Sequence, residues 1–530
     1  MRADKIDLDE KFSRGMARSK WDNYIPSQYC YNMENIRING KGMGPRLGYT
    51  TIYTWESEEK CRWLFGDPIT KRLFRVMWSK WEEIDYEDWI ITDRSDGETL
   101  EEVPYNFIQF GDYIVLMNGT SLPYIYDTEN DTLDPATNID SWVFSWFWEV
   151  FGNYTFLAFK NKLYFSGPIV LWEEDNAVFW TSWSSPDTQQ IIYKSDIKWL
   201  VSTLNRLRIF TNDYIEYIDE STAQTVGSAA NIFSVRFAEG QNLINHKSLV
   251  AVWSKLFYMT DQIKVKSVWY KEGVAELQIG NISEPDSPNE IGIDEYIRQE
   301  LAPEQPDIFG IRNERDNNVE WHMRSKWSLF NDVVLIYNLE SRSFMIDRGK
   351  NFQNATLIGD RMFATPKFQT DVVYEDRLWR TDKWSTIICK YKTTWLKLWL
   401  PNLQKFFRWA EFGWKINNFT KMVISSEVDG ISVMKRLTIF EGARSLWEWA
   451  GIAYNPIWWQ PIAGNNLDQK DEQLRPFNKV ITQSQVRKKW LSNTREIETT
   501  GIWQDRYLDY MALFAYLSSK YKKYRLKDKF

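Results

Sequence analysis

A repeated hairpin phrase constrains the fold of this chain more than any other feature. Each copy is a short apolar run, a two-residue polar break and a second apolar run that ends in a small or polar residue, as β-hairpins do. The breaks lie about 45 to 50 residues apart, with about twice that distance before the last copy. The five copies are Phe107 to Gly119, Thr155 to Gly167, Leu200 to Asn212, Leu249 to Asp261 and Thr356 to Thr365.

Two further segments extend the series. A weaker copy begins at Leu73, and residues Val319 to Asp347 supply another hairpin. A period of this length with several strands and no helical pattern is typical of a β-propeller, whose blades are four-stranded sheets. An all-β sandwich with accidental regularity is the alternative.

We therefore predict an all-β fold with a β-propeller over residues 51–384. Residues 1–50 are assigned to an N-terminal arm and first-strand region, and residues 385–450 to an additional β-domain. Residues 451–530 are assigned to a Gly-, Pro- and Asn-rich loop and a basic tail, with a helix expected from Asp505 to Lys523. The polar residues 1–20 are expected to pack on little of their own chain and, with the tail after Lys520, to contact a neighbouring subunit or partner.

The hairpin pattern also predicts individual turns and core positions. The turns should lie at Gly111-Asp112, Lys160-Asn161, Leu204-Asn205, Trp253-Ser254 and Gly359-Asp360. The strand residues next to these turns should be buried, namely Ile114, Leu116, Leu163, Phe165, Leu207, Ile209, Leu256 and Tyr258.

Composition excludes several classes of protein. The 530 residues carry 65 basic and 72 acidic side chains, a net charge of −7, which is the wrong sign for a nucleic-acid coat. Two histidines and three distant cysteines leave little material for a metal site or a disulfide scaffold. The mixed charges of residues 1–16 do not form a signal peptide, and no run has the roughly 18 apolar residues of a membrane span. We expect no cofactor and synthesis in a cytoplasm.

Catalytic motifs are also missing from the sequence. Carboxylate pairs occur at Glu58-Glu59, Glu82-Glu83, Glu101-Glu102 and Glu173-Glu174, in polar stretches that favour solvated turns over catalysis. The segment from Tyr126 to Asp134 resembles a calcium loop through Asp127, Asn130 and Asp131 but lacks the EF-hand spacing. We therefore predict no catalytic, cofactor-binding or metal residues and no enzymatic activity.

The N-terminal phrase carries a resemblance to a known family. Residues Asn32 to Ile38 (NMENIRI), a glycine turn and Pro45 to Tyr49 (PRLGY) resemble the opening of tailed-phage propeller proteins, in which ENxxI…G…xRxGY starts the first blade. The family is the tail nozzle, or tail tubular protein B, with relatives among head-to-tail stopper and hub proteins. Segments Val319 to Asp347 and Leu200 to Asp219 and the loop near Pro461 are similar to pieces of the same family.

The resemblance implies a function that composition alone does not. It implies a non-enzymatic virion protein, a tail nozzle or head-tail connector component that is assembled in the host cytoplasm. Such a protein forms a ring, six-fold in this family, contacts adjacent tail or connector proteins, and lets genomic DNA pass without specific binding. Nozzle, stopper and hub remain open, as does a carbohydrate-binding propeller for host-surface recognition.

Tryptophan is unexpectedly frequent, with 29 residues against 25 glycines. Several tryptophans occupy places where a turn favours glycine, because a tight hairpin requires a positive φ at its first residue. We hypothesise that some of these codons are UGA, read as glycine in the native host. Trp321 alternates with Val319 and Met323 and is interpreted as a real tryptophan. The glycine-like positions are Trp78, Trp81, Trp253, Trp447, Trp449, Trp458 and Trp459.

Overall fold

The computed structural model describes the chain in segments that cover most of the predicted propeller and the strands of a second β-domain. These segments are 4–7, 15–18, 29–39, 42–52, 61–77, 79–88, 90–103, 105–136, 147–151, 154–165, 190–203, 206–219, 235–236, 243–270, 277–283, 292–366, 372–376, 381–382, 385–393, 405–416, 421–428, 431–432, 437–440, 475–481, 489–490, 494–500 and 506–517.

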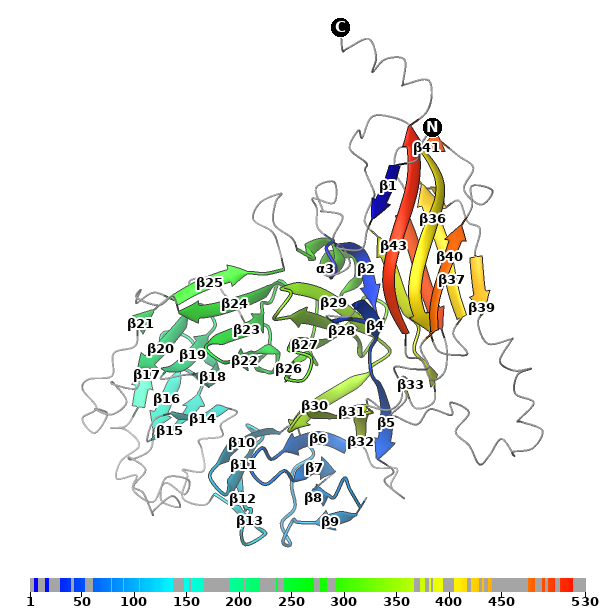
Figure 1. Cartoon of the computed structure of the whole chain (residues 1–530). Helices are drawn as coiled ribbons and strands as arrows, with labels where there is room; N and C mark the ends of the chain where they lie inside the picture. Colours follow the sequence, from blue (N-terminus) through cyan, green and yellow to red (C-terminus); the bar gives the residue numbers. More distant parts are fainter. Residues whose placement is uncertain are drawn as a thin grey trace, which may run out of the picture.

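The predicted β-propeller is confirmed and has seven blades (Figure 1). Blades 1 to 5 are antiparallel four-stranded sheets of consecutive strands, as local hairpins favour. Blade 1 contains β6 (Cys61–Gly66), β7 (Leu73–Met77), β8 (Lys80–Ile84) and β9 (Ile91–Asp93), and blade 2 contains β10 (Asn106–Phe110), β11 (Tyr113–Met117), β12 (Tyr124–Asp127) and β13 (Thr132–Pro135). Blade 3 contains β14 (Phe147–Phe151), β15 (Tyr154–Phe159), β16 (Lys162–Phe165) and β17 (Gln190–Ile192), and blade 4 contains β18 (Ile197–Thr203), β19 (Arg206–Thr211), β20 (Ile215–Asp219) and β21 (Val235–Arg236). Blade 5 contains β22 (Val250–Val252), β23 (Lys255–Met259), β24 (Val265–Tyr270) and β25 (Leu277–Asn281).

Blades 6 and 7 are parts of larger sheets. Among the described residues the only α-helix, α3 (Asp294–Glu300), precedes blade 6, and no helix is long and apolar enough to span a membrane. Blade 6 contains β26 (Phe309–Asn313), β27 (Asn318–Arg324), β28 (Asn331–Asn338) and β29 (Ser343–Arg348), and blade 7 contains β30 (Phe352–Ile358), β31 (Arg361–Pro366), β32 (Val372–Asp376) and β5 (Gly48–Ile52).

Strand β5 closes the ring. It comes from the N-terminus and pairs antiparallel with β32, from Gly48 opposite Asp376 to Ile52 opposite Val372. The next strand along the chain, β6, begins blade 1 and contacts β30 of blade 7. The predicted boundary between residues 50 and 51 is therefore wrong, because it divides a strand of the last blade.

The predicted hairpin turns and core positions are confirmed where they are described. Gly111, Lys160, Trp253 and Gly359 each begin a two-residue turn with φ between 50° and 60°. The fifth turn, Leu204-Asn205, lies outside the described residues, although Thr203 and Arg206 pair on either side of it. All eight predicted core residues are fully or almost fully buried.

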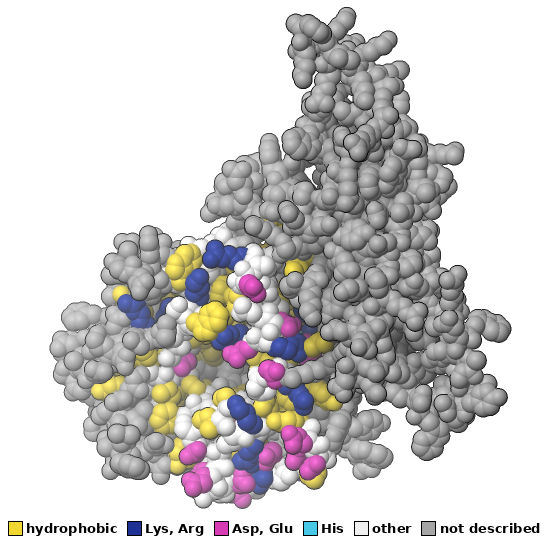
Figure 2. Space-filling view, viewed as in Figure 1, with side chains coloured by type: hydrophobic (Ala, Val, Ile, Leu, Met, Phe, Trp, Pro, Cys, Tyr) yellow, Lys and Arg dark blue, Asp and Glu magenta, His cyan; other side chains and the backbone are white. Residues whose placement is uncertain are grey.

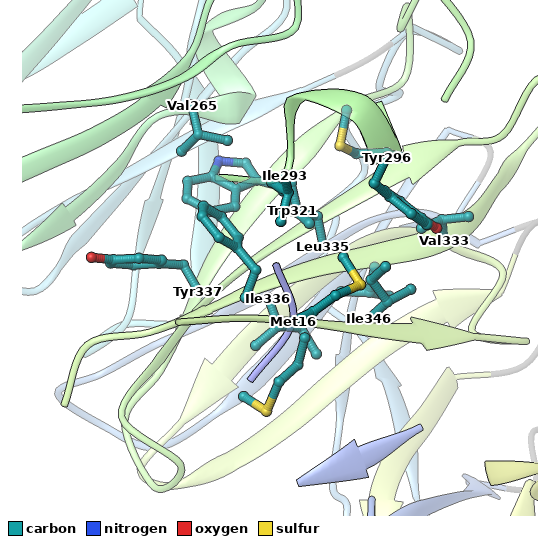
Figure 3. Packing of buried hydrophobic residues seen from close by; sticks show 14 of the residues in the cluster. Met16, Val265, Ile293, Tyr296, Trp321, Val333, Leu335, Ile336, Tyr337 and Ile346 are labelled. Carbon is teal, nitrogen blue, oxygen red and sulfur yellow. The ribbon is translucent and has the colours of Figure 1, made fainter. Parts of the chain in front are cut away.

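Apolar clusters fill the junctions between neighbouring blades. The cluster between blades 1 and 2 contains Phe74, Trp81 and Leu116, and the cluster between blades 3 and 4 contains Phe156 and Leu200. The largest cluster, shown in Figure 3, joins blades 5 and 6 to the N-terminal segment. The central strands of the blades are buried on both sides because a blade packs against its two neighbours.

Both chain ends contribute to the second β-domain, the upright sheets at the upper right of Figure 1. One sheet joins N-terminal strands to C-terminal ones, and the other extends blade 6 from its outer edge. The first sheet contains β1 (Asp4–Asp7), β3 (Ile36–Asn39), β4 (Gly42–Pro45), β36 (Lys405–Ile416), β40 (Arg475–Ile481), β41 (Lys489–Trp490) and β43 (Arg506–Leu517). The second sheet adds to blade 6 the strands β2 (Cys30–Glu34), β35 (Cys389–Thr393), β37 (Lys421–Val428), β38 (Ile431–Ser432), β39 (Leu437–Phe440) and β42 (Thr494–Thr500). Blade 7 is extended by β33 (Thr381–Asp382) and β34 (Ser385–Thr386).

The expected helix from Asp505 to Lys523 is wrong. Residues Arg506–Leu517 form strand β43, which pairs with β36 along its length. A long apolar run suits a buried strand or a helix, and a distant partner decides between them. The separation of 385–450 from 451–530 is also wrong, because strands of both ranges share sheets. The predicted loop near Pro461 and the basic tail after Lys520 lie outside the described residues.

The N-terminal arm packs on its own chain, contrary to expectation, wherever it is described. Met16 and Ala17 are fully buried, and the Met16 amide donates to the Phe344 carbonyl at 2.7 Å. Met16 lies within the largest core cluster (Figure 3), and β1 pairs with β43. Two adjacent apolar residues are too short a run to give a recognisable period.

Candidate functional site

The N-terminal phrase forms a buried polar assembly, which we call the clasp: Asn35, Arg37, Arg46, Asp347 and Asp382. Its centre is Asn35, which adopts φ 58°, a left-handed conformation that asparagine tolerates. The Asn35 Oδ1 atom accepts hydrogen bonds from Arg46 Nε at 3.0 Å and from the Arg348 amide at 2.9 Å. Its Nδ2 atom donates to the Ile388 carbonyl at 2.8 Å, so one side chain joins three distant segments.

Arg37 and Asp347 form a two-pronged ion pair. The two guanidinium nitrogens Nη1 and Nη2 lie 2.7 and 2.6 Å from the two carboxylate oxygens. Burial alone would raise the pKa of Asp347, but the charges of Arg37, Lys350 and Arg46 outweigh burial and hold it far below its usual range. Asp347 is therefore ionised in a solvent-free position on β29.

Arg46 links the N-terminal segment to the extension of blade 7. Its Nη1 atom donates to Asp382 Oδ1 at 2.7 Å and to the Leu47 carbonyl at 2.9 Å, and its Nη2 atom pairs with Asp382 Oδ2. Arg46 is almost completely buried. Two residues later the chain enters β5, where the Tyr49 ring packs edge-on against Phe352 at 5.3 Å. The clasp thus fixes the strand that closes the ring.

A second polar group lies beside the clasp, on one face of β27. Asn318, Glu320 and His322 alternate along this strand and are completely buried. Glu320 Oε1 accepts from Asn313 Nδ2 at 3.0 Å, whereas Glu320 Oε2 and both His322 ring nitrogens have no hydrogen-bond partner among the described residues. Burial raises the pKa of Glu320 and, helped by the charge of Lys350, lowers that of His322 to about 3.

This arrangement suits a structural role better than acid–base catalysis. The neutral His322 ring stacks on Phe309 at 4.3 Å, and the surrounding side chains exclude solvent. A general acid or base must reach a proton on a bound substrate, and the His322 ring packs against Phe309 of blade 6 and Phe352 of blade 7.

The carboxylate pairs have different roles. Glu82 and Glu83 lie within strand β8 rather than in a solvated turn, so the expectation for this pair is wrong. Glu82 pairs with Arg75 at 2.7 Å, and Glu83 receives two hydrogen bonds from Arg72 at 2.7 and 2.6 Å. Glu101 lies in a loop and accepts from the Thr120 hydroxyl at 2.7 Å. The pairs at 58–59 and 173–174 lie outside the described residues.

The calcium-like segment is the turn between β12 and β13. The Asp127 carboxylate accepts from the amides of Glu129 and Asn130 at 2.8 and 3.1 Å, which is an Asx turn. Asp131 lies 2.7 Å from Arg72 and 2.9 Å from Arg94. Both carboxylates are therefore used by the hairpin and by ion pairs.

Three of the tryptophans considered for recoding from glycine lie in the described residues, and their environments differ. Trp253 adopts φ 50° in its turn and is 66% exposed, as a position suited to glycine would be. Trp321 is fully buried, and its Nε1 atom donates to the Ser248 carbonyl at 2.8 Å. Trp81 lies in β8 and stacks on Phe74 at 4.9 Å, so its assignment to a turn is wrong. Trp78 and the four positions from 447 to 459 lie outside the described residues.

The clasp was not foreseen from the sequence as a set of contacts. One feature of the sequence does indicate buried polar contacts: Arg37 and Arg46 interrupt apolar segments, as Glu320 does in Val319–Met323 (VEWHM). A charged residue inside a strand with two buried faces requires a buried partner. The sequence does not show that the partners lie about 300 residues away.

Comparisons with known proteins give partial likenesses. No family model and no curated protein matches the chain. The β-propeller domain of Myceliophteria thermophila Cps50 (Swd1) is 10% identical over 62% of this chain and 99% of that domain, with a TM-score of 0.41. The designed protein Ika8 is 8% identical over 61% of this chain and 98% of its own, with a TM-score of 0.35. U3-55K is 8% identical over 62% of this chain and 98% of its own, with a TM-score of 0.37.

Proposed function

We propose that the protein is a non-enzymatic structural component of a phage virion, a tail nozzle or head-tail connector subunit. On this proposal it forms a homo-oligomeric ring, a hexamer by family resemblance, in the virion. Its partners are adjacent tail or connector proteins, and genomic DNA passes through the ring without specific binding.

The observation that carries the proposal is the location of the family-like phrase. Asn35, Arg46 and Tyr49 are defining residues of the phrase, and each has a specific contact in or next to the clasp. The phrase therefore positions the strand that closes the propeller. This gives a physical reason for its residues and spacing, and it supports the resemblance from which the function is inferred.

The charge distribution is compatible with a conduit that does not retain DNA. Figure 2 shows acidic and basic side chains mixed over the described face of the propeller. Each phosphate contact made by a lysine or arginine would slow the passage of DNA. A net charge of −7 disfavours such contacts.

Exposed indoles are the observation that favours the second candidate, a carbohydrate-binding propeller. Trp253 and Trp327 are 66% and 87% exposed. However, Trp253 follows the first strand of its blade and Trp327 follows the second strand, so the two lie at opposite ends of the propeller. They do not form one sugar-stacking platform, and the Arg312 guanidinium lies 5.0 Å from the Trp253 ring centre.

The test is the composition and assembly of purified particles. We expect mass spectrometry to detect the protein in virions, and light scattering with electron microscopy to show a closed ring of the purified protein. A stable monomer that is absent from particles would contradict the proposal. Quenching of its tryptophan fluorescence by host polysaccharide would instead support the carbohydrate-binding alternative.

A further inference from the structure

A short segment before blade 5 contacts the first strands of several blades. The first strands of the blades lie around the axis, because they contact one another from blade to blade, as β30 with β6 and β14 with β18 do. The short helix η3 (His246–Ser248) lies between blades 4 and 5, immediately before β22. Its side chains contact the first strands of blades on the other side of the ring.

His246 joins blades 2, 3 and 4. Its Nε2 atom lies 3.1 Å from Asn106 Oδ1 at the start of β10. Its ring stacks on Trp199 of β18 with 4.7 Å between ring centres and lies 5.4 Å from Phe147 of β14. Burial, with a smaller effect from Lys247, lowers the pKa of His246 to about 3, so the ring is neutral and Nε2–H donates to Asn106.

Lys247 and its neighbours reach blades 1 and 6. The Lys247 Nζ atom lies 3.6 Å above the Trp63 ring of β6, a cation–π contact. Asn245 Nδ2 donates to the Pro306 carbonyl at 3.3 Å, and the Ser248 carbonyl accepts from Trp321. A Cβ atom at Gly310 of β26 would lie 2.5 Å from Val250 and 3.1 Å from the Ser248 carbonyl, so the strand and this segment are in close contact.

We propose that Asn245–Leu249 is a plug that closes one end of the central channel and holds six of the seven blades together. Blades arranged around an open channel make few contacts with one another across the axis. The plug precedes blade 5 and supplies such contacts to blades 1, 2, 3, 4 and 6. The channel end therefore carries neither a polymer nor a small ligand. One consequence rests on the proposed function: in a phage conduit, DNA would pass along a surface outside the propeller channel.

Cysteine labelling of the purified full chain tests the plug without reference to virions. Asn106→Cys places a thiol beneath His246, and Asp112→Cys places one on the exposed turn of the same blade as a control. Peptide mass spectrometry separates these thiols from the native cysteines. We expect a maleimide to modify position 106 at least about tenfold more slowly than position 112. We also expect the combination of His246→Gly and Lys247→Gly to remove most of that difference while leaving the rate at position 112 unchanged.

A cross-link provides a second measurement if the glycine variant does not fold. The His246→Cys, Asn106→Cys double variant should give an intramolecular product with a short bismaleimide, which neither single variant should give. Equal labelling rates at positions 106 and 112 in the otherwise unchanged chain, or the lack of the intramolecular cross-link, would overturn the plug. Neither result depends on whether the protein belongs to a phage particle.

Discussion

The junction between blades 1 and 2 and the junction between blades 6 and 7 both combine apolar packing with ion pairs, but they bury the charges to different depths. At the first, Trp81 stacks on Phe107 of the next blade at 5.7 Å and Phe74 contacts Tyr126 at 5.3 Å. At the second, apolar contacts are supplemented by Arg315 and Glu375, 2.7 Å apart, and by Lys350 and the clasp. The first junction also carries ion pairs from Arg72 and Arg94 to Asp131, but these side chains are only partly buried, whereas Lys350 and Asp347 at the closing junction are almost completely buried.

Buried charge is favourable only where it is paired, and two carboxyl groups show the difference. Asp347 lies among three cations, which hold its pKa low in spite of burial. Glu149 is half-buried on β14 between blades 3 and 4; its low-dielectric surroundings raise its pKa to about 8 in spite of hydrogen bonds from the Ser202 and Val150 backbone, and no cation pairs with it among the described residues. Almost fully buried ion pairs thus mark the closure, whereas the Glu149 carboxyl group has backbone partners only.

The largest effect is expected from breaking the clasp. Arg46→Ala leaves Asp382 without its main partner and opens space in the core, which should lower the free energy of unfolding by about 3–5 kcal/mol. Arg298→Ala, at an exposed pair on α3, is the matched control and should cost less than about 1 kcal/mol. Urea unfolding followed by circular dichroism measures both, and equal losses would mean that the clasp does not hold the ring.

The apolar junction should respond nearly as strongly to loss of volume. Leu116→Ala removes a fully buried side chain between blades 1 and 2 and should cost about 2–4 kcal/mol. Leu329→Ala makes the same change at an exposed position and should stay within about 0.5 kcal/mol. The same unfolding experiment measures both, and a small effect at Leu116 would show that the repeat junctions are loosely packed.

Glu149→Gln should increase stability at neutral and alkaline pH by about 1–3 kcal/mol. The folded carboxyl group has a pKa of about 8 against an ordinary 4.5, so between these values the folded state holds a proton that the unfolded chain releases. Stability of the parent protein therefore falls as pH rises from about 4.5 to 8, and the variant should lack that contribution. Thermal unfolding of both proteins at pH 5, 7 and 8 measures how their stability changes with pH. The same pH dependence in parent and variant would mean that Glu149 is in contact with water.

The smallest effect is expected at the Trp253 turn. Trp253→Gly relieves the positive φ and loses the contact with Arg312, so we expect a net gain of up to about 1 kcal/mol. Trp321→Gly, at a buried and hydrogen-bonded indole, should instead prevent stable folding. Mass spectrometry of the native peptide around position 253 completes the test, because tryptophan there would contradict recoding at this site.

Sequence reasoning succeeded where structure is local and failed where it is not. The turns at Gly111 and Gly359 and core residues such as Leu116 and Ile209 follow from a period of two within one hairpin. Strand β5 and the clasp depend on partners more than 300 residues away, and the strand character of β43 depends on a partner about 100 residues away. A single sequence carries no record of such pairing, so the propeller was predictable and the way it closes was not.

Closure by β5 has a consequence for the timing of synthesis. Gly48 leaves the ribosome early, yet its partner Asp376 is made more than 300 residues later, which corresponds to roughly 20 to 60 s of translation. Throughout that interval the nascent chain carries an unpaired closing strand and an incomplete ring, both open to pairing with other chains. A growing chain of this kind is a natural client for chaperones, and its yield in a foreign host should depend on how fast the last blade is translated.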